Sequence, residues 1–210
     1  MLAGMLSVFV RTSGCNLRCA WCDTPYTSWR PEGTEWDLEA IVAEARAHET
    51  RYVVVTGGEP MIAPEIVPLC EQLRAAGKHI TMETAGTVFQ PVACDLMSIS
   101  PKLANSTPAD PAWAERHDRL RIQPDVLAEL MGRYDYQLKF VIATPGDIAE
   151  VLDLAAALGA DRERVVLMPE GIDSERLRER GRWIAEVCKR EGFRFSPRLH
   201  VDLWGDARGV

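Results

Sequence analysis

Short β-branched runs alternate with amphipathic helical segments along almost the whole chain, and this alternation limits the folds open to it. Strands are predicted at residues 7–11, 52–55, 79–83, 95–99, 137–142, 164–168 and 193–199. Apolar residues at helical spacing between them predict helices near 38–45, 66–73, 146–158 and 174–190. Strands that alternate with helices form a parallel sheet, and the functional residues lie at the carboxyl ends of its strands.

The expected fold class is therefore α/β, with residues 1–210 in a single domain. A chain of 210 residues with 47% hydrophobic residues can bury one sizeable core. Six or seven strands are too few for a closed barrel of eight, so we expect a partial, open (β/α) barrel with about six parallel strands. Residues 102–123 break the alternation. They are predicted to be an irregular insertion, either a lid or a surface excursion, with a short helix near 112–117.

Composition excludes several functional classes. The net charge of −7 disfavours a surface that binds nucleic acid. No apolar stretch approaches the ~20 residues that span a membrane. The amino-terminal residues show no basic region leading into an apolar one, so we expect no signal peptide and a cytoplasmic protein.

Three of the six cysteines, Cys15, Cys19 and Cys22, form a CxxxCxxC run that Asp23-Thr24 follows directly. Clustered cysteines in a cytosolic chain indicate a metal or redox site. Iron–sulfur clusters and structural zinc normally take four protein ligands, so three thiolates leave one position open for a small molecule. Zinc with a distant fourth ligand such as His200 stays possible, and a thiol redox pair would leave Cys15 without a role. The other three cysteines are expected in or beside the core.

A second motif, Thr56-Gly57-Gly58-Glu59-Pro60, stands where a buried strand is predicted to end. Two glycines let the backbone approach a ligand closely. The carboxylate of Glu59 can pair with an ammonium group. Such a motif is often only a tight turn, but its place at a strand's carboxyl end favours a binding site.

Together these motifs resemble the radical S-adenosylmethionine (SAM) superfamily. The resemblance implies that Cys15, Cys19 and Cys22 hold a [4Fe–4S] cluster whose open iron chelates the amino and carboxylate groups of SAM. It also implies that residues 57–59 lie along the methionyl end of SAM and that Trp21 lies near the adenine. Another radical SAM enzyme, such as a glycyl-radical activase, shares these features, and a non-catalytic zinc-binding module remains the distant alternative.

A narrower resemblance, to the 7-carboxy-7-deazaguanine synthase family, rests on motifs from about residue 6 to the end of the chain. They are Phe9-Val10-Arg11-Thr12-Ser13-Gly14-Cys15, Cys22-Asp23-Thr24, Glu83-Thr84-Ala85-Gly86, Ser100-Pro101-Lys102, Lys139-Phe140-Val141 and Leu199-His200. This family rearranges 6-carboxy-5,6,7,8-tetrahydropterin to 7-carboxy-7-deazaguanine by radical ring contraction with loss of ammonia, in queuosine-type biosynthesis. The resemblance implies a Mg²⁺ on Thr24, a flavodoxin-like electron donor and a homodimer.

The same resemblance assigns the remaining site residues. Those implied to bind the cofactor are Trp21, Cys22, Asp23, Gly57, Gly58, Glu59, Glu83, Ser100, Pro101 and Lys102. Those implied to bind the substrate are Arg11, Thr56, Gly58, His200 and Val210, with residues 193–210 closing the substrate pocket. Without the resemblance, His200 would be an ordinary core or surface histidine, Lys139 a surface charge at a strand end, and Asp23-Thr24 a turn cap.

The sequence also departs from the family at its start. The family normally opens with a Gln-Gly-Glu-Gly turn ahead of the Phe-Val-Arg segment, and that turn contacts the pterin. This sequence begins at Met1-Leu2-Ala3-Gly4, where the turn would end. Either the start of the sequence is placed too late, or this member of the family lacks those contacts.

Overall fold

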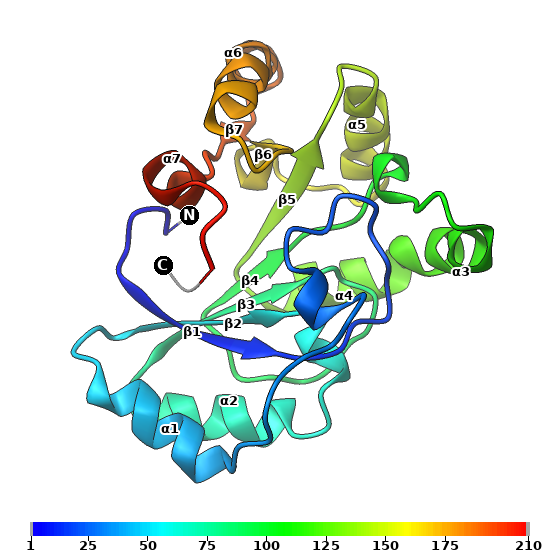
Figure 1. Cartoon of the computed structure of the whole chain (residues 1–210). Helices are drawn as coiled ribbons and strands as arrows, with labels where there is room; N and C mark the ends of the chain where they lie inside the picture. Colours follow the sequence, from blue (N-terminus) through cyan, green and yellow to red (C-terminus); the bar gives the residue numbers. More distant parts are fainter. Residues whose placement is uncertain (1, 209–210) are drawn as a thin grey trace.

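All seven strands of the computed structural model, which describes residues 2–208, lie parallel in one sheet (Figure 1). Their spatial order follows the chain, from β1 at one edge to β7 at the other. The strands are β1 (Ser7–Thr12), β2 (Tyr52–Gly57), β3 (His79–Thr84), β4 (Leu96–Ile99), β5 (Tyr136–Ile142), β6 (Val165–Pro169) and β7 (Arg194–Phe195). The predicted α/β class and the open parallel sheet are confirmed, with seven strands rather than about six.

Helices follow most strands and lie along the outside of the curved sheet (Figure 1). They are α1 (Leu38–Ala47), α2 (Ile66–Ala75), α3 (Pro111–Arg121), α4 (Pro124–Arg133), α5 (Asp147–Ala157), α6 (Ser174–Glu191) and α7 (Leu199–Trp204). Among residues 2–208, no helix combines the length and the apolar character that crossing a membrane requires.

The two faces of the sheet carry different side chains. On the face packed against the helices, Val53, Val55, Ile80 and Met82 are fully buried in the main hydrophobic core. We call the opposite face the inner face. Parallel sheets covered on both sides carry apolar residues on both faces, so a polar inner face indicates a sheet that is left open for a ligand.

Polar side chains of the inner face line up across neighbouring strands. Arg11 of β1 pairs in register with Thr56 of β2. The Thr56 hydroxyl donates to Glu83 of β3. Glu83 pairs in register with Ser98 of β4, which pairs in turn with Gln137 of β5. Residues predicted to act together from distant parts of the sequence thus lie in one row.

Residues 102–123 are more regular than predicted. They contain a short 3₁₀ turn, Ala104–Ser106, and the eleven-residue helix α3, which replaces the short helix expected near 112–117. Helix α4 follows directly and was not predicted. The Asp110 side chain accepts a hydrogen bond from the Ala112 amide and so caps α3, with Pro111 in its first turn.

The predicted strand at 193–199 is wrong over most of its length. Only Arg194 and Phe195 pair with β6, and the Ser196 amide makes the next hydrogen bond, to the Leu167 carbonyl. Pro197 has no amide hydrogen and cannot continue the ladder. The chain instead turns into the short helix α7, which brings the C-terminal segment back towards the start of the chain (Figure 1).

Candidate active site

The cysteine loop lies between the end of β1 and the start of α1, at the edge of the sheet where the strands end. Cys15, Cys19 and Cys22 are free thiols that pack in one small cluster with Leu17 and Ala85. This cluster is separate from the main core. The loop therefore brings together three sulfur atoms that no disulfide consumes.

Burial sets the state of two thiols of the loop, Cys15 and Cys19. It raises the pKa of Cys15 and raises that of Cys19 to about 12, although the positive charge of Lys102 opposes both shifts. Thiols held in this way stay protonated at neutral pH until a metal replaces the proton.

The donor set fits a three-cysteine iron–sulfur cluster. Within residues 2–208, no three His, Cys, Asp or Glu side chains, with or without His200, already surround one point as ligands of a single ion. A cluster of several irons needs no common point, since each cysteine binds a different iron. His117 supplies no fourth ligand, because the Arg18 amide and the Ser106 hydroxyl occupy its two ring nitrogens at 3.2 and 2.9 Å.

Gly57 and Gly58 hold the cysteine loop against the end of β2. The Gly58 amide donates to the Thr12 carbonyl at 3.1 Å, and the Glu59 amide donates to the Gly14 carbonyl at 2.9 Å. A Cβ atom on Gly58 would lie 2.0 Å from the Gly14 carbonyl oxygen, and one on Gly57 would lie 2.1 Å from that of Thr12. The two glycines thus allow the end of β2 to lie close to the start of the cysteine loop, rather than close to a ligand.

The carboxylate of Glu59 is fully buried and bound to protein donors. It accepts hydrogen bonds from the Thr84 hydroxyl at 2.7 Å, the Ala85 amide at 2.8 Å and the Met61 amide at 3.1 Å. Burial raises its pKa in spite of these three bonds. Glu59 therefore joins the ends of β2 and β3, and protein donors occupy both oxygens of its carboxylate.

An ion pair crosses the inner face. Lys139 Nζ of β5 lies 2.7 Å from Glu83 Oε1, while the Thr56 hydroxyl donates to Glu83 Oε2 at 3.1 Å. The charge of Lys139 is the main cause that lowers the pKa of Glu83. Lys139 is not the strand-end surface charge that the residue alone would suggest, because its side chain is largely buried over the sheet.

The residues after β4 approach the cysteine loop from the other side. Lys102 Nζ donates to Ser100 Oγ at 2.9 Å and lies 5.8 Å from the ring centre of Trp21. Pro101 between them is buried. Asn105 accepts a hydrogen bond from the Trp21 ring nitrogen at 3.1 Å. The structure thus brings together four residues that were predicted to bind the cofactor.

Residues 102–123 also support the cysteine loop directly. The Ser106 carbonyl accepts from the Ala20 amide at 2.8 Å, and the buried His117 of α3 accepts from the Arg18 amide at 3.2 Å. The guanidinium of Arg18 stacks over the Trp113 ring at 4.4 Å. This segment packs against the cysteine loop and is not a surface excursion.

Asp23, next to Cys22, forms an ion pair with Arg198. Burial alone would raise the pKa of Asp23, but the charge and hydrogen bond of Arg198 outweigh burial and lower it. Thr24 precedes the 3₁₀ turn Pro25–Thr27, yet its side chain makes no capping bond there. Its hydroxyl lies 3.9 Å from Cys22 Sγ.

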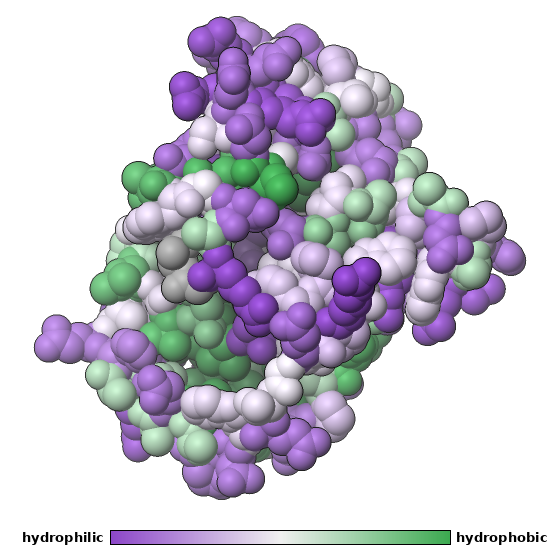
Figure 2. Space-filling view, viewed as in Figure 1, coloured by the Kyte–Doolittle hydropathy of each residue, from purple (hydrophilic) through white to green (hydrophobic). Residues whose placement is uncertain are grey.

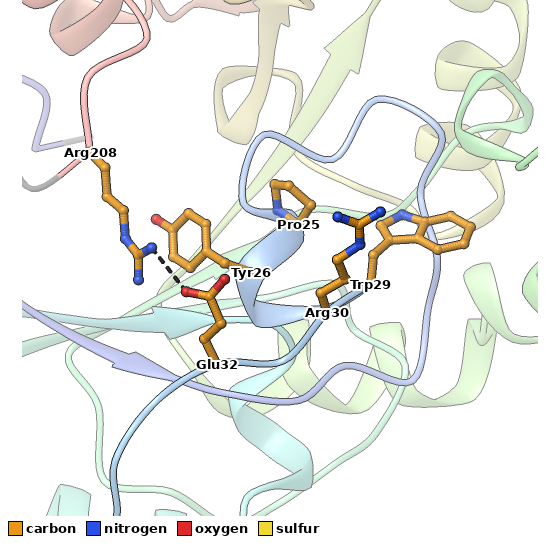
Figure 3. A pocket seen from close by; sticks show the side chains of 6 residues that line it. All are labelled: Pro25, Tyr26, Trp29, Arg30, Glu32 and Arg208. Atoms are coloured by element: carbon orange, nitrogen blue, oxygen red, sulfur yellow. Dashed lines mark hydrogen bonds and ion pairs between the residues drawn. The ribbon is translucent and has the colours of Figure 1, made fainter.

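Two hollows flank the residues that follow the cysteines. The smaller, about 270 Å³, is lined by Trp21, Cys22 and Asp23 on one side and by Glu170, Ile172 and Asp206 on the other. The larger, about 590 Å³, contains none of the residues assigned individually to the cofactor or the substrate, although Arg208 of the predicted closing segment 193–210 lines it (Figure 3). In it, Arg208 lies 3.8 Å over the Tyr26 ring and pairs with Glu32 at 3.1 Å. The smaller hollow is therefore the one that belongs to the cysteine site.

The predicted substrate residues are only partly brought together. Arg11 and Thr56 share the inner face, and Arg11 and His200 are both exposed. The pKa of His200 is lowered, first by burial and then by the charges of Arg198 and Arg11. Val210 lies outside the described residues.

Sequence reasoning missed four residues that shape the site: Asn105, His117, Lys139 and Arg198. Asn105 and His117 lie in the segment predicted to be irregular, so no pattern pointed to them. Arg198 directly precedes the Leu199-His200 motif, which was the one available signal. Glu170 and Ile172 could be expected near the site only from their place after β6, at the same sheet edge.

Comparison with known proteins agrees with this geometry. The Radical SAM superfamily profile matches residues 9–102. The 7-carboxy-7-deazaguanine synthase of Halobacterium salinarum is 45% identical over 220 residues, which cover 98% of this chain and 86% of the relative. That of Rhodopirellula baltica is 41% identical over 213 residues, which cover 100% of this chain and 83% of the relative.

Solved structures share the fold. QueE from Escherichia coli has a TM-score of 0.66 at 24% identity, over 93% of this chain and 86% of that one. Streptococcus suis SuiB bound to S-adenosylmethionine has a TM-score of 0.61 at 14% identity, over 93% of this chain and 51% of that one. From the near-complete match to curated relatives, the chain belongs to the 7-carboxy-7-deazaguanine synthase family of the radical SAM superfamily.

Proposed function

We propose that this protein converts 6-carboxy-5,6,7,8-tetrahydropterin to 7-carboxy-7-deazaguanine. The observation that carries the proposal is the meeting of a three-cysteine loop with a polar, open sheet face in a chain 45% identical to a curated synthase over nearly its full length. The glycyl-radical activase and zinc-module alternatives gain no support from these relatives.

Membership of the radical SAM superfamily implies a [4Fe–4S] cluster and SAM. Cys15, Cys19 and Cys22 would hold the cluster, which with SAM supplies the radical chemistry of the reaction. The backbone of residues 57–59 would hold the methionyl end of SAM. Glu83 and Ser100-Pro101-Lys102 would bind further along it, with Trp21 at the adenine and Asp23 beside the cluster.

On the substrate side, we assign the pterin carboxylate to Arg11, because a guanidinium can bind a carboxylate with two parallel hydrogen bonds. Thr56 and Gly58 would meet the ring edge, and His200 and Val210 would close the pocket. A Mg²⁺ fits beside Thr24, whose hydroxyl makes no capping bond. Mg²⁺ accepts a single hydroxyl because it keeps several of its waters and takes further oxygens from the substrate.

The proposal includes three statements about the protein's surroundings. The cluster must be reduced, so we propose a flavodoxin-like electron donor. Six free cysteines support the cytoplasm, where thiols stay reduced. Exposed apolar side chains of α7 and the segment before β1, including Leu6, Leu203 and Trp204, support a homodimer. Figure 2 shows apolar areas on this face of the molecule.

The test is anaerobic incubation of the reconstituted, reduced protein with SAM, Mg²⁺ and the carboxytetrahydropterin. We expect 7-carboxy-7-deazaguanine and ammonia by mass spectrometry and colorimetric assay. Cys22→Ala should abolish product because it removes a cluster ligand. Cys188→Ala, a buried cysteine outside the loop, is the matched control and should keep activity.

Two results would count against the proposal. Cleavage of SAM with no deazaguanine product would assign the protein another substrate. Product formation by the Cys22→Ala variant at the unmodified rate would remove the cysteine loop from the reaction.

A further inference from the structure

Arg198 joins two parts of the chain that are far apart in sequence. It lies between β7 and α7, is 7% exposed, and forms an ion pair with Asp23, 175 positions earlier. Asp23 directly follows the cluster cysteine Cys22. One buried guanidinium thus links the C-terminal segment to the cysteine loop.

A contribution to folding stability does not by itself explain why a guanidinium is buried at this position. The Arg198 side chain is 6% exposed, whereas that of Asp23 is 39% exposed. Taking a guanidinium out of water costs several kcal/mol, and an apolar residue of similar size often serves stability equally well. Arg198 Nε is moreover buried without a hydrogen-bond partner among the described residues. Buried unpaired donors are rare in folded proteins and often mark functional places.

The backbone of Arg198 lies at the start of α7. Its carbonyl oxygen accepts hydrogen bonds from the Val201 amide at 2.9 Å and the Asp202 amide at 3.1 Å, which begin α7. His200, a proposed substrate residue, lies in that first turn. Arg198 therefore connects Asp23 with the first turn of α7, which carries His200.

We propose that Arg198 is a positioning residue that makes the order of α7 and His200 depend on the cluster held by the cysteine loop. Metal binding fixes Cys22, which fixes Asp23 and, through the ion pair, Arg198. The position of His200 on the substrate side of the pocket would then be fixed only after the cysteine loop has bound its cluster. The link to substrate rests on the proposed function, but the link between cluster and α7 does not.

Hydrogen exchange tests the link between cluster and α7. We expect the amides of residues 199–204 to exchange about tenfold or more slowly after anaerobic reconstitution than before it, because local opening then costs more. In Arg198→Met this difference should vanish, although iron and sulfide contents match those of the unmodified protein. Arg182→Met, at an exposed position of α6, is the matched control and should keep it.

Two further variants keep the test decisive if Arg198→Met folds poorly. Asp23→Asn removes the charge from the other side and should also remove the difference in exchange. Arg198→Lys keeps the charge and should restore part of it. Equal slowing of exchange in the unmodified protein, Arg198→Met and Asp23→Asn would overturn the proposal.

Kinetics test the link to substrate separately. In Arg198→Met we expect the KM for the pterin to rise about tenfold, the scale of a lost buried charge contact, with SAM cleavage in the absence of pterin retained. An unchanged KM would overturn this part. If the unmodified protein makes no deazaguanine, the proposed function fails, while the exchange experiment still decides the role of Arg198.

Discussion

Gly58 shows how one residue can be essential for a reason other than ligand contact. A glycine pair after a strand suggests a backbone that a ligand approaches. In the structure the neighbour of Gly58 is the Gly14 carbonyl, next to Cys15. The same glycine pair in a sequence can therefore indicate either a ligand-binding backbone or a close contact between two loops.

Replacing Gly58 with alanine should therefore destabilise the protein and disturb the cysteine loop together. We expect a loss of about 1–3 kcal/mol in the free energy of unfolding, because the added methyl group meets backbone atoms that cannot rotate away. Urea unfolding and the iron content after reconstitution would measure the two effects.

Gly132→Ala is the matched control for this substitution. Gly132 lies in α4 with open space around its Cβ position, so alanine should stabilise by about 0.5–1 kcal/mol. A Gly58→Ala variant with unmodified stability and normal iron loading would show that the loop at residue 14 yields easily.

Some residues of the site could be predicted from the sequence and others could not. The three cysteines and the glycine pair could be predicted to form a site because their spacing along the chain is typical of that chemistry. Arg198 could not, since its partner Asp23 stands 175 positions away and only the fold brings them together. Lys139 was open to misreading for the same reason.

At the scale of strands, the ion pair between Glu83 and Lys139 reaches from β3 to β5 across the intervening β4. Ser98 of β4 is the residue in register with Glu83, and its small side chain leaves room for the pair above it. The Gln137 side-chain amide donates a hydrogen bond to Ser98 Oγ at 2.9 Å and fixes the orientation of that hydroxyl. Three strands are therefore tied by polar contacts on the inner face.

Lys139→Met should change how stability depends on pH. Glu83 has a folded-state pKa below its ordinary value of 4.5, so its contribution is complete above about pH 5 and lost as the pH falls through the folded pKa. Without Lys139 the carboxylate loses its charged partner and keeps only the Thr56 hydroxyl, which should cost about 1–3 kcal/mol at pH 7. The variant should then lose less further stability in acid.

Chemical unfolding between pH 3 and 7 would measure this difference. Lys189→Met removes the partner of Glu186 in an exposed pair and is the control, expected to change stability by less than about 1 kcal/mol. Parallel stability curves for Lys139→Met and the unmodified protein would refute the role given to this ion pair.

Most strands and helices could be predicted, and the exceptions have physical causes. Helix α3 buries only His117, so it has no apolar stripe for a periodicity to reveal. The end of β7 depends on Pro197, which ends the ladder although the apolar residues around it favour a longer strand. Element order was readable because each strand pairs with the next one in the chain.

At the scale of the molecule, the protein has a large core and a small separate cluster around the cysteines. The triple variant Cys15→Ala, Cys19→Ala and Cys22→Ala should therefore keep its fold while losing iron and activity. We expect an unchanged far-ultraviolet circular dichroism spectrum and a loss of less than about 2 kcal/mol in unfolding free energy.

Leu73→Ala is the comparison for the triple variant. Leu73 is fully buried in the main core, and its truncation should cost about 2–5 kcal/mol. Loss of cooperative unfolding in the triple variant would mean that the cysteine loop is part of the main folding unit.

The division of the sheet into an apolar outer face and a polar inner face has a consequence for divergence. Because side chains alternate along each strand, the inner face can be exchanged one position per strand while the packed face stays untouched. Substitutions on the inner face can thus change substrate specificity while the packing of the hydrophobic core stays the same. A designer could begin with the exposed Arg11, because Thr56, Ser98 and Gln137 are buried and Thr56 and Gln137 bond to neighbouring strands.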